Sequence, residues 1–281
     1  MTDSQPTVAV VTDSTADIPP AQCAELGIAV VPAVLTMGGE TFADGVDISR
    51  EEFYRRLPHL TEPATTGAPS PLAFEKAYER ALSAGANKVL SIHLSSKLSG
   101  LLNAATQAAK TFGDRVRTFD SGQVSLGLGF QAMEAAAASL AHGSFEAVME
   151  AAQRARESVK LIAMIDTLNY LHRSGRISWL TAGLGNLLQV KLLLEVVDGV
   201  ANRLGQVRTK TKALDQLFAL ASSWGPLERL AIAHSAAPSE AESFSQRLKH
   251  LCARPPLIAE VTSAIGAHIG PGAIGVIALT R

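Results

Sequence analysis

The sequence lacks an excess of charge of either sign. It contains 25 lysine and arginine residues and 26 aspartate and glutamate residues, which gives a formal net charge of −1 at pH 7. Proteins that bind nucleic acid or an anionic membrane through electrostatics carry a basic patch or stripe. The near balance of charges therefore argues against nucleic acid as a partner and against attraction to a membrane surface.

Cysteines and long apolar runs are also scarce. The two cysteines, Cys23 and Cys252, lie far apart and predict neither a disulfide framework nor a metal-ligand pattern, so we expect no metal and no cofactor. The apolar stretch LLQVKLLLEVV is interrupted by Gln189, Lys191 and Glu195 and falls short of the ~20 residues of a membrane span. The first residues contain no signal-peptide pattern. We expect a cytoplasmic protein without stable membrane insertion.

Short runs of valine, isoleucine and leucine recur, and each is followed by a helix-like segment. Runs of this length indicate strands buried on both faces, and their alternation with helices indicates βαβ units in a parallel sheet. The predicted strands cover residues 8–11, 88–94, 116–119, 160–165 and 230–233. Serine, threonine or aspartate follows each of them. Such residues either cap the next helix or together line a cleft at the carboxyl edge of a sheet.

Capping and turn residues predict the other elements. Ser49 before REEFYRRL and Ser70-Pro71 before LAFEKAYERAL are typical helix starts. The Asp-Gly pair within KLLLEVVDGVANRL predicts a β-hairpin. We therefore expect an α/β protein with a parallel-sheet N-terminal domain, residues 1–159, and a smaller α+β C-terminal domain, residues 160–281. The boundary is soft, because the strand at its start is also able to join the first sheet.

Familiar catalytic motifs such as G-x-x-x-x-G-K-[ST], G-x-S-x-G and H-E-x-x-H are absent from the sequence. GLGFQA and GLGNLL are similar to dinucleotide-binding loops, but neither follows a strand as required, so we interpret them as glycines that pack helices. IGAHIGPGAIG, residues 265–275, places His268 in a glycine-rich loop without an acid, a cysteine or a second histidine nearby in sequence. Such an imidazole is either a structural histidine or a ligand donor.

Six motifs together resemble the DegV family. They are VVTDSTADIP, ATTGAPSPLAFEKAY, LSIHLSSKLSGLLNAA, TFDSGQVSLGLGF, LNYLHRSGRIS and GAHIGPGAIGV, and they follow the family's order along the whole chain. The resemblance implies two α/β domains with a ligand between them, and it implies binding of a long-chain fatty acid. Some members of the family present the fatty acid to a separate fatty acid kinase, which forms the acyl phosphate for phospholipid synthesis.

The resemblance also implies the site residues. The family's carboxylate-binding threonine, serine and histidine fall on Thr66, Ser95 and His268. Hydroxyl and imidazole groups are able to hold a carboxylate without the strong, bidentate grip of an arginine. The tail of the fatty acid is expected in an apolar channel. Two arginines that the family associates with its kinase fall on Arg176 and Arg208.

Two positions depart from the family's pattern. Gly67 stands where a serine is common, so the site loses one hydroxyl. Leu192 stands where a proline is common, at the start of the predicted hairpin strand, and this change bears on the junction between the domains.

Other interpretations of the same residues remain open. Thr66 also fits a plain loop hydroxyl, Ser95 a helix cap, and Arg176 and Arg208 a turn residue and a solvated charge. Ser95 and His268 also suit the nucleophile and base of a serine hydrolase that acts on a lipid ester, although no acid is available in sequence to orient His268. A regulatory lipid-binding module is a third alternative.

Overall fold

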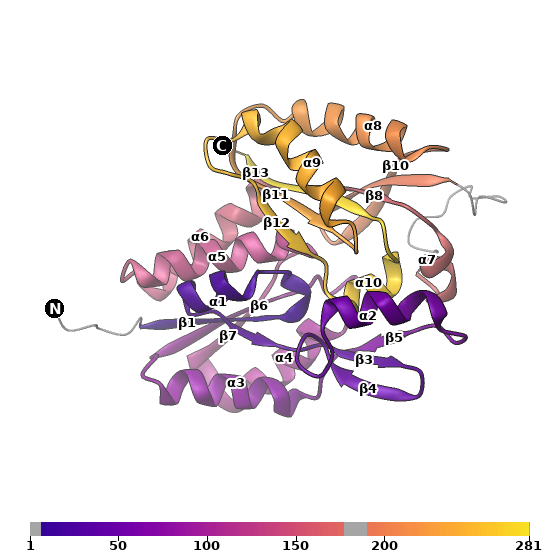
Figure 1. The fold of residues 1–281 in the computed structure, drawn as a ribbon. Helices are drawn as coiled ribbons and strands as arrows, with labels where there is room; N and C mark the ends of the chain where they lie inside the picture. The colour runs from indigo at the N-terminus through magenta and orange to yellow at the C-terminus, as the bar shows by residue number, and fades with distance from the viewer. Residues whose placement is uncertain (1–6, 177–189, 281) are drawn as a thin grey trace. The chain divides into compact units, whose positions relative to one another are not determined.

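The computed structural model describes residues 7–176 and 190–280 (Figure 1). The contacts divide the chain into two compact units. The first consists of residues 1–33 and 67–157, and the second consists of residues 34–66 and 158–281. Each unit is built from two stretches of sequence, because the chain leaves the first unit after residue 33 and returns to it at residue 67.

This division differs from the predicted domains in one segment. The prediction placed residues 34–66 in the N-terminal domain, whereas they belong to the second unit, which is thereby the larger of the two rather than the smaller. The later change of unit, between residues 157 and 158, lies close to the predicted boundary. The segment was misassigned because its contacts are made with residues some 200 positions later in the sequence, which local patterns do not report.

A parallel sheet forms the centre of the first unit. Within the described residues it has four strands in the order β2-β1-β6-β7, and every neighbouring pair is parallel. The strands are β1 Val8–Asp13, β2 Ala29–Val31, β6 Lys88–His93 and β7 Val116–Asp120. The apolar side chains of β1 and β6 are almost all buried, as continuous apolar runs predict for a sheet covered on both faces.

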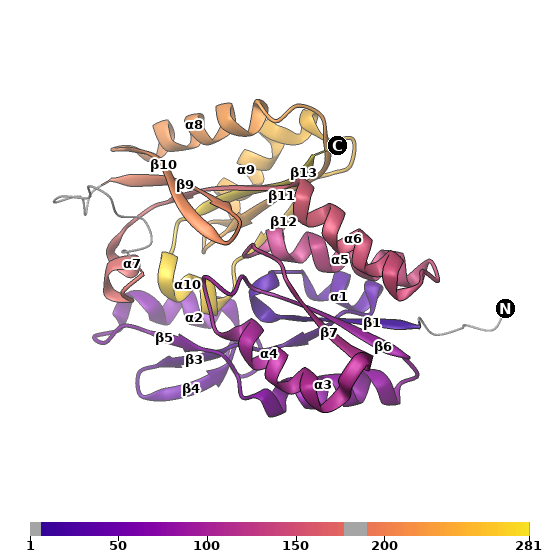
Figure 2. The ribbon, with the colours of Figure 1, turned by 180° about the vertical axis from the view of Figure 1, so that it is seen from behind.

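Helices cover both faces of this sheet (Figure 2). α3 and α4 pack against each other on one face, and α5, with α1 against it, packs on the other. The helical segments are η1 Ser14–Ala16, α1 Pro20–Leu26, α3 Pro71–Ser83, α4 Leu101–Ala109, η3 Lys110–Arg115, α5 Leu126–Leu140 and α6 Phe145–Ser158. α3 begins after Ser70 as predicted, although the Ser70 side chain makes no capping hydrogen bond.

A mixed sheet forms the centre of the second unit. Among the described residues its order is β10-β9-β8-β13-β11-β12, antiparallel throughout except for the parallel pair β11–β12. Its strands are β8 Val159–Ile165, β9 Lys191–Val197, β10 Val200–Val207, β11 Leu227–His234, β12 Leu257–Glu260 and β13 Ile274–Thr280. The predicted strands 160–165 and 230–233 therefore exist, but they lie in this sheet and not in a parallel one.

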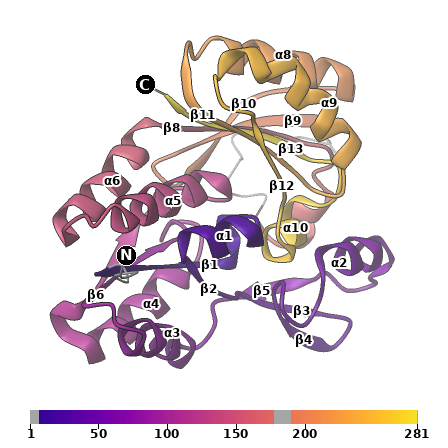
Figure 3. The same cartoon turned by 60° about the vertical axis from the view of Figure 1, so that its left-hand side comes forward.

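The predicted hairpin is confirmed. β9 and β10 are antiparallel around Asp198 and Gly199, whose φ angles are 47° and 74°. A tight hairpin turn of this kind requires positive φ at both central residues, which Asp-Gly readily adopts. Leu192, the residue that replaces the family's proline, is fully buried in β9 and pairs with Ile165 on one side and Gln206 on the other. α8 Lys210–Ser222 and α9 Pro238–Leu248 cover one face of the sheet (Figure 3).

The segment 34–66 packs against helix α10, late in the sequence (Figure 3). It contributes a small sheet, in the order β4-β3-β5 within the described residues, and helix α2, which contacts α10. The elements of this region are β3 Val34–Met37, β4 Glu40–Ala43, α2 Arg50–Arg56, η2 Leu57–His59, β5 Thr65–Gly67, α7 Asn169–Arg173 and α10 Ser263–Ile269. The short helix η5 Lys249–Leu251 instead follows α9 and packs against it. Ser49 caps α2 as predicted, since its hydroxyl accepts a hydrogen bond from the Glu52 N–H at 3.1 Å.

Close packing and hydrogen bonds explain why this segment belongs to the second unit. Phe53 and Tyr54 of α2 lie against Gly266 of α10, where an added Cβ would come within 2.5 Å of the Tyr54 hydroxyl oxygen. That hydroxyl donates to the Val261 carbonyl at 3.0 Å. The absence of a side chain at Gly266 therefore lets the two aromatic rings approach the helix and anchor the segment.

The glycines of GLGFQA serve helix packing, in agreement with the sequence-based interpretation, whereas GLGNLL lies outside the described residues. Gly127 and Gly129 are buried in α5. A Cβ at Gly129 would lie 2.5 Å from the Ala16 carbonyl oxygen, which is backbone, whereas one at Gly127 would lie 2.8 Å from the Gln123 side-chain oxygen. The backbone contact is rigid and the side-chain contact is adjustable.

We predict that Gly129→Ala lowers the free energy of unfolding by about 1–3 kcal/mol, because an overpacked core must shift its backbone. Gly127→Ala is the matched control in the same helix. It should be much milder, because Gln123 is able to move and alanine favours helix by about 1 kcal/mol over glycine. Urea unfolding of both variants checks this, and equal stabilities would contradict it.

Candidate functional site

Thr66 and His268 meet within the second unit. Thr66 is the central residue of β5, and its hydroxyl oxygen lies 2.8 Å from Nε2 of His268. His268 lies in the last turn of α10, which Gly270 ends with a φ of 69°. The prediction that His268 sits in a glycine-rich loop is thus wrong. The glycines flank and follow a short helix, and this helix fixes the position of the imidazole.

Burial sets the charge of His268. Burial, and to a smaller extent the nearby positive charge of Arg176, together lower the pKa of the imidazole from an ordinary value of 6.5 to about 4. The imidazole is therefore neutral at pH 7. A neutral imidazole has one N–H donor and one nitrogen acceptor, which differs from the two donors of the charged form.

The neutral pair always has one donor to spare. Nδ1 of His268 is buried and has no hydrogen-bond partner among the described residues. If Nδ1 carries the proton, Thr66 donates to Nε2 and the Nδ1–H remains for another acceptor. If Nε2 carries it, the imidazole donates to Thr66 and the threonine O–H remains. In either tautomer the pair is suited to bind an acceptor such as a carboxylate oxygen.

Ser95 is the contribution of the first unit to the predicted site. It follows β6 and is almost fully buried. Its carbonyl accepts hydrogen bonds from the N–H groups of Leu98 and Ser99 at 2.9 and 3.1 Å, which form a turn. The alternative interpretation of Ser95 as the cap of the following helix is wrong, because α4 starts at Leu101 with Gly100 as its N-cap.

Three of the five predicted polar strand ends gather at one edge. The residues that follow β1, β6 and β7 all lie at the carboxyl edge of the parallel sheet. Among them, Asp120 accepts from the Ser96 hydroxyl at 2.6 Å and from the Gly122 N–H at 2.9 Å. The polar residues after β8 and β11 belong to the mixed sheet instead. The cleft lined by five strand ends is therefore not formed within either sheet.

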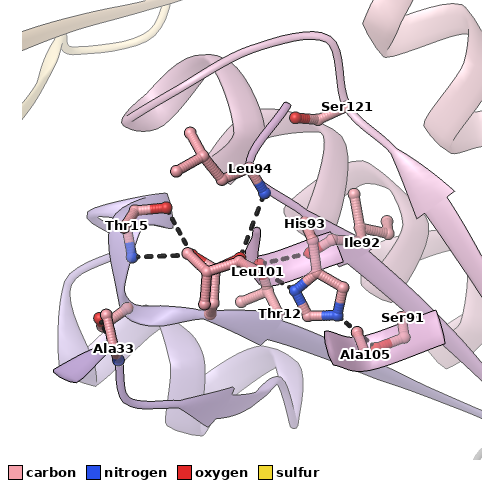
Figure 4. A network of polar contacts seen from close by, with 12 residues as sticks. Thr12, Thr15, Ala33, Ser91, Ile92, His93, Leu94, Leu101, Ala105 and Ser121 are labelled. Carbon is pink, nitrogen blue, oxygen red and sulfur yellow. Dashed lines mark hydrogen bonds and ion pairs between the residues drawn. The ribbon is translucent and has the colours of Figure 1, made fainter. Parts of the chain in front are cut away.

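Sequence analysis missed a buried polar network beneath this edge (Figure 4). His93 Nδ1 lies 2.9 Å from Asp13 Oδ2, and His93 Nε2 lies 2.6 Å from the Ser91 hydroxyl. Ser91 in turn lies 2.9 Å from the Tyr78 hydroxyl. Burial raises the pKa of Tyr78 to about 12, so the phenol stays protonated. The signal in the sequence is Ser91 and His93 at a spacing of two, which places both side chains on one face of the strand.

The network has the connectivity of a serine–histidine–aspartate triad but not its accessibility. Ser91, His93 and Asp13 are each 0% exposed, and the Ser91 hydroxyl lies within hydrogen-bond distance of both His93 Nε2 and the Tyr78 hydroxyl, so it is engaged inside the network. A hydrolase requires its nucleophile within reach of the reacting carbonyl. These residues stabilise the sheet and its carboxyl edge, and they do not form a catalytic site.

Comparison with known proteins identifies the relatives of this chain. The family model "Uncharacterised protein, DegV family" matches residues 7–281. A DegV domain-containing protein of Streptomyces coelicolor is 36% identical over 281 residues, which cover 98% of this chain and 99% of that protein. The chain belongs to the DegV family.

Two solved structures of the family are similar along the whole chain. A DegV family protein of Thermus thermophilus, described as binding fatty acid, is 30% identical with a TM-score of 0.88, covering 98% of this chain and 100% of that one. The fatty-acid-binding DegV of Bacillus subtilis is 29% identical with a TM-score of 0.86, covering 98% and 99%. The predicted two-domain fold of the family is thus confirmed.

Gly67, where the family commonly has a serine, leaves the space of that side chain unfilled. Gly67 ends β5 beside Thr66, and a Cβ built on it would have no atom of the described residues within 4 Å. The missing hydroxyl is therefore not compensated by a neighbouring side chain that fills its place.

The two predicted kinase-contacting arginines differ in surroundings. Arg176 ends the turn after α7, where its N–H donates to the Leu171 carbonyl at 2.9 Å and its guanidinium donates to the Ser174 carbonyl at 2.8 Å. Arg208 directly follows β10 and is exposed, as the sequence predicts for a strand-end residue. Arg176 ties down its own turn and also bears on the charge of His268.

Within residues 7–176 and 190–280, no group of three or more histidine, cysteine, aspartate or glutamate side chains is arranged to hold a metal ion. In the same part of the chain, no helix combines the length and the apolar character needed to cross a bilayer.

The lowered pKa of His268 predicts a specific loss of stability in acid. The unfolded chain takes up a proton at this residue near pH 6.5, whereas the folded protein does so only near pH 4. Lowering the pH from 7 to 4.5 therefore favours the unfolded chain, by on the order of 2 kcal/mol from this group. His268→Gln should remove that part of the acid sensitivity.

Urea unfolding at pH 7 and pH 4.5 measures the effect, with His59→Gln as a control because His59 is exposed. The stability lost between the two pH values should shrink in His268→Gln and stay at the parent value in His59→Gln. If both variants lose as much as the parent, the buried neutral state assigned to His268 is wrong.

Proposed function

We propose that the protein binds a long-chain fatty acid and presents it to a separate fatty acid kinase. Thr66, Ser95 and His268 hold the carboxylate, and the tail occupies an apolar channel. The observation that carries the proposal is the neutral Thr66–His268 pair with its spare donor, in a chain whose relatives of known structure are described as fatty-acid-binding. The chain acts as a carrier without a cofactor, and the kinase activity belongs to the partner.

The tail and the head group of the fatty acid are expected to contribute differently to the free energy of binding. Each buried methylene contributes about 0.8 kcal/mol, so a tail of a dozen methylenes contributes roughly 10 kcal/mol before the cost of association. A hydrogen bond to a charged group contributes only about 1.5–3 kcal/mol. The tail therefore supplies most of the affinity, and the head-group residues decide where the reacting carboxylate oxygen lies.

The same arrangement suits delivery to a kinase. Neutral donors hold a carboxylate less tightly than an arginine fork, which leaves its oxygen available as a nucleophile for a phosphoryl group. Acyl-phosphate formation requires ATP, so we place the carrier in the cytoplasm with its kinase. Arg176 and Arg208 are proposed to contact that partner.

We predict that Thr66→Ala and Ser95→Ala each weaken fatty-acid binding about 10- to 100-fold, since each leaves the buried carboxylate short of a donor. Competition against a fluorescent fatty acid measures this, after mass spectrometry has identified the acid that copurifies with the parent. Thr106→Ala is the matched control, because Thr106 is exposed and its hydroxyl lies 3.0 Å from that of the half-buried Thr118, a pair outside the proposed site.

Unchanged affinity in both Thr66→Ala and Ser95→Ala would remove these residues from the site. A parent protein that carries no acid, yet hydrolyses lipid esters in a manner abolished by Ser95→Ala, would establish the hydrolase alternative instead.

We also predict that His268→Ala impairs delivery more than binding. Most of the affinity comes from the tail, whereas a shift of the head group by ~1 Å is able to cost ~100-fold in rate. The measurement is acyl-phosphate formation with purified kinase, ATP and saturating fatty acid, with binding followed in parallel.

Arg208→Ala provides the comparison in that assay. It should keep the parent's affinity for fatty acid and lose turnover in a way that a higher kinase concentration restores. Full turnover by His268→Ala would show that His268 has only a structural role.

A further inference from the structure

The peptide groups before and after Leu94 are held from opposite sides. The Leu94 N–H donates to Asp13 Oδ2 at 3.2 Å, and the Ser95 N–H donates to the Gln123 carbonyl at 3.1 Å. The first acceptor comes from the end of β1 and the second from the segment after β7. Two successive peptide planes are thereby fixed, which leaves the Ser95 side chain only its own χ1 rotation.

The Ser95 hydroxyl is oriented for donation. Its oxygen accepts a hydrogen bond from the Lys97 N–H at 3.3 Å. Its own O–H has no acceptor among the described residues, and the side chain is only 1% exposed. A hydroxyl has one proton to donate. The turn therefore holds the Ser95 hydroxyl in place while its O–H remains available to donate a hydrogen bond.

Capping alone does not account for Asp13. Its Oδ1 accepts from the Thr15 N–H at 3.0 Å and from the Thr15 hydroxyl, which is ordinary capping of η1. A serine performs that task with a neutral side chain. Asp13 instead buries a full carboxyl group at 0% exposure, and directs its second oxygen to His93 Nδ1 and the Leu94 N–H. Burial of a charge is costly unless its contacts are needed.

We propose that Asp13 is a positioning residue for the head-group site. Its second oxygen fixes the Leu94 peptide and the His93 ring, and through them the direction of the Ser95 hydroxyl. The inference rests on the proposed function, in which Ser95 donates to the fatty-acid carboxylate. Asp13 itself does not touch the ligand.

The far end of the same network offers a matched control. The Tyr78 hydroxyl lies within hydrogen-bond distance of Ser91, which in turn reaches His93, but among the described residues Tyr78 forms no hydrogen bond with Leu94 or with the turn that holds Ser95. A purely structural network would respond alike to changes at either end. If Asp13 has a positioning role, substitution of Asp13 changes recognition of the fatty-acid head group, whereas substitution of Tyr78 changes only the stability of the protein.

The test compares parent, Asp13→Ser, Asp13→Asn and Tyr78→Phe for binding of hexadecanoic acid and its methyl ester. Asp13→Ser keeps a hydroxyl acceptor for the Thr15 N–H and loses the second oxygen, so it separates capping from positioning. We expect it to weaken binding of the acid about tenfold and binding of the ester less than about twofold. Tyr78→Phe should keep the parent's ratio of acid to ester affinity even where its unfolding temperature falls. Asp13→Asn has nearly the parent's side-chain shape, and it takes the place of Asp13→Ser in this comparison if the serine variant does not fold.

A double-mutant cycle with Ser95→Ala decides whether Asp13 acts through Ser95. In the Ser95→Ala background, Asp13→Ser should change the affinity for hexadecanoic acid by less than about twofold, because residues that act on one contact are not additive. Full additivity would overturn the proposal, and so would a parent-like ratio of acid to ester affinity in folded Asp13→Ser or Asp13→Asn.

Hydrogen exchange separates this proposal from the proposed function. Asp13→Ser should speed exchange at the amides of Leu94 and Ser95 relative to the amides of β8 and β13 in the second unit, with or without a ligand. If Ser95→Ala binds hexadecanoic acid like the parent, the proposed head-group role of Ser95 fails. If exchange at Leu94 and Ser95 stays at the parent rate in Asp13→Ser, the positioning role fails on its own.

Discussion

The carboxyl edge of the parallel sheet depends on acceptors for the N–H groups where its strands end. Backbone N–H groups that leave a ladder while still buried need partners. Two aspartates supply them on either side of β6. Asp13 accepts from Thr15 and Leu94, and Asp120 accepts from Gly122 and Ser96. Each carboxylate thus links the turn after its own strand, β1 or β7, to the turn after β6. These links fix the positions of the three turns at the carboxyl edge of the sheet.

In the second unit, the main constraint is the burial of a neutral histidine, His268. α10 carries His268, and α2 presses two aromatic rings on the same helix through Gly266. Burial of His268 is the main cause of its lowered pKa, and the positive charge of Arg176 acts in the same direction. Thr66 then takes up one ring nitrogen. The segment 34–66 therefore contributes both the aromatic rings that pack on α10 at Gly266 and the threonine that lies within hydrogen-bond distance of the imidazole.

Sequence patterns predicted the local elements well and the long-range pairings poorly. The five apolar runs are strands, Ser49 caps its helix, and Asp198-Gly199 makes a hairpin, because each depends on neighbours in sequence. β13 was not predicted, although it lies at the centre of the mixed sheet between β8 and β11. The glycine-rich stretch before it suggested a loop, and the residues of β8 and β11 that pair with it are 40 or more positions away in sequence.

The sequence by itself determined the strand-forming runs, the caps and the turn, and its motifs identified the family. These follow from φ/ψ preferences and side-chain periodicity, which act over a few residues. Only the tertiary structure decided that residues 34–66 join the second unit, that His268 lies on a helix beside Thr66, and that Asp13 and His93 are buried together. The imidazole of His268 is neutral and Asp13 reaches the Leu94 peptide because distant segments enclose them, and burial is a property of the whole packed chain.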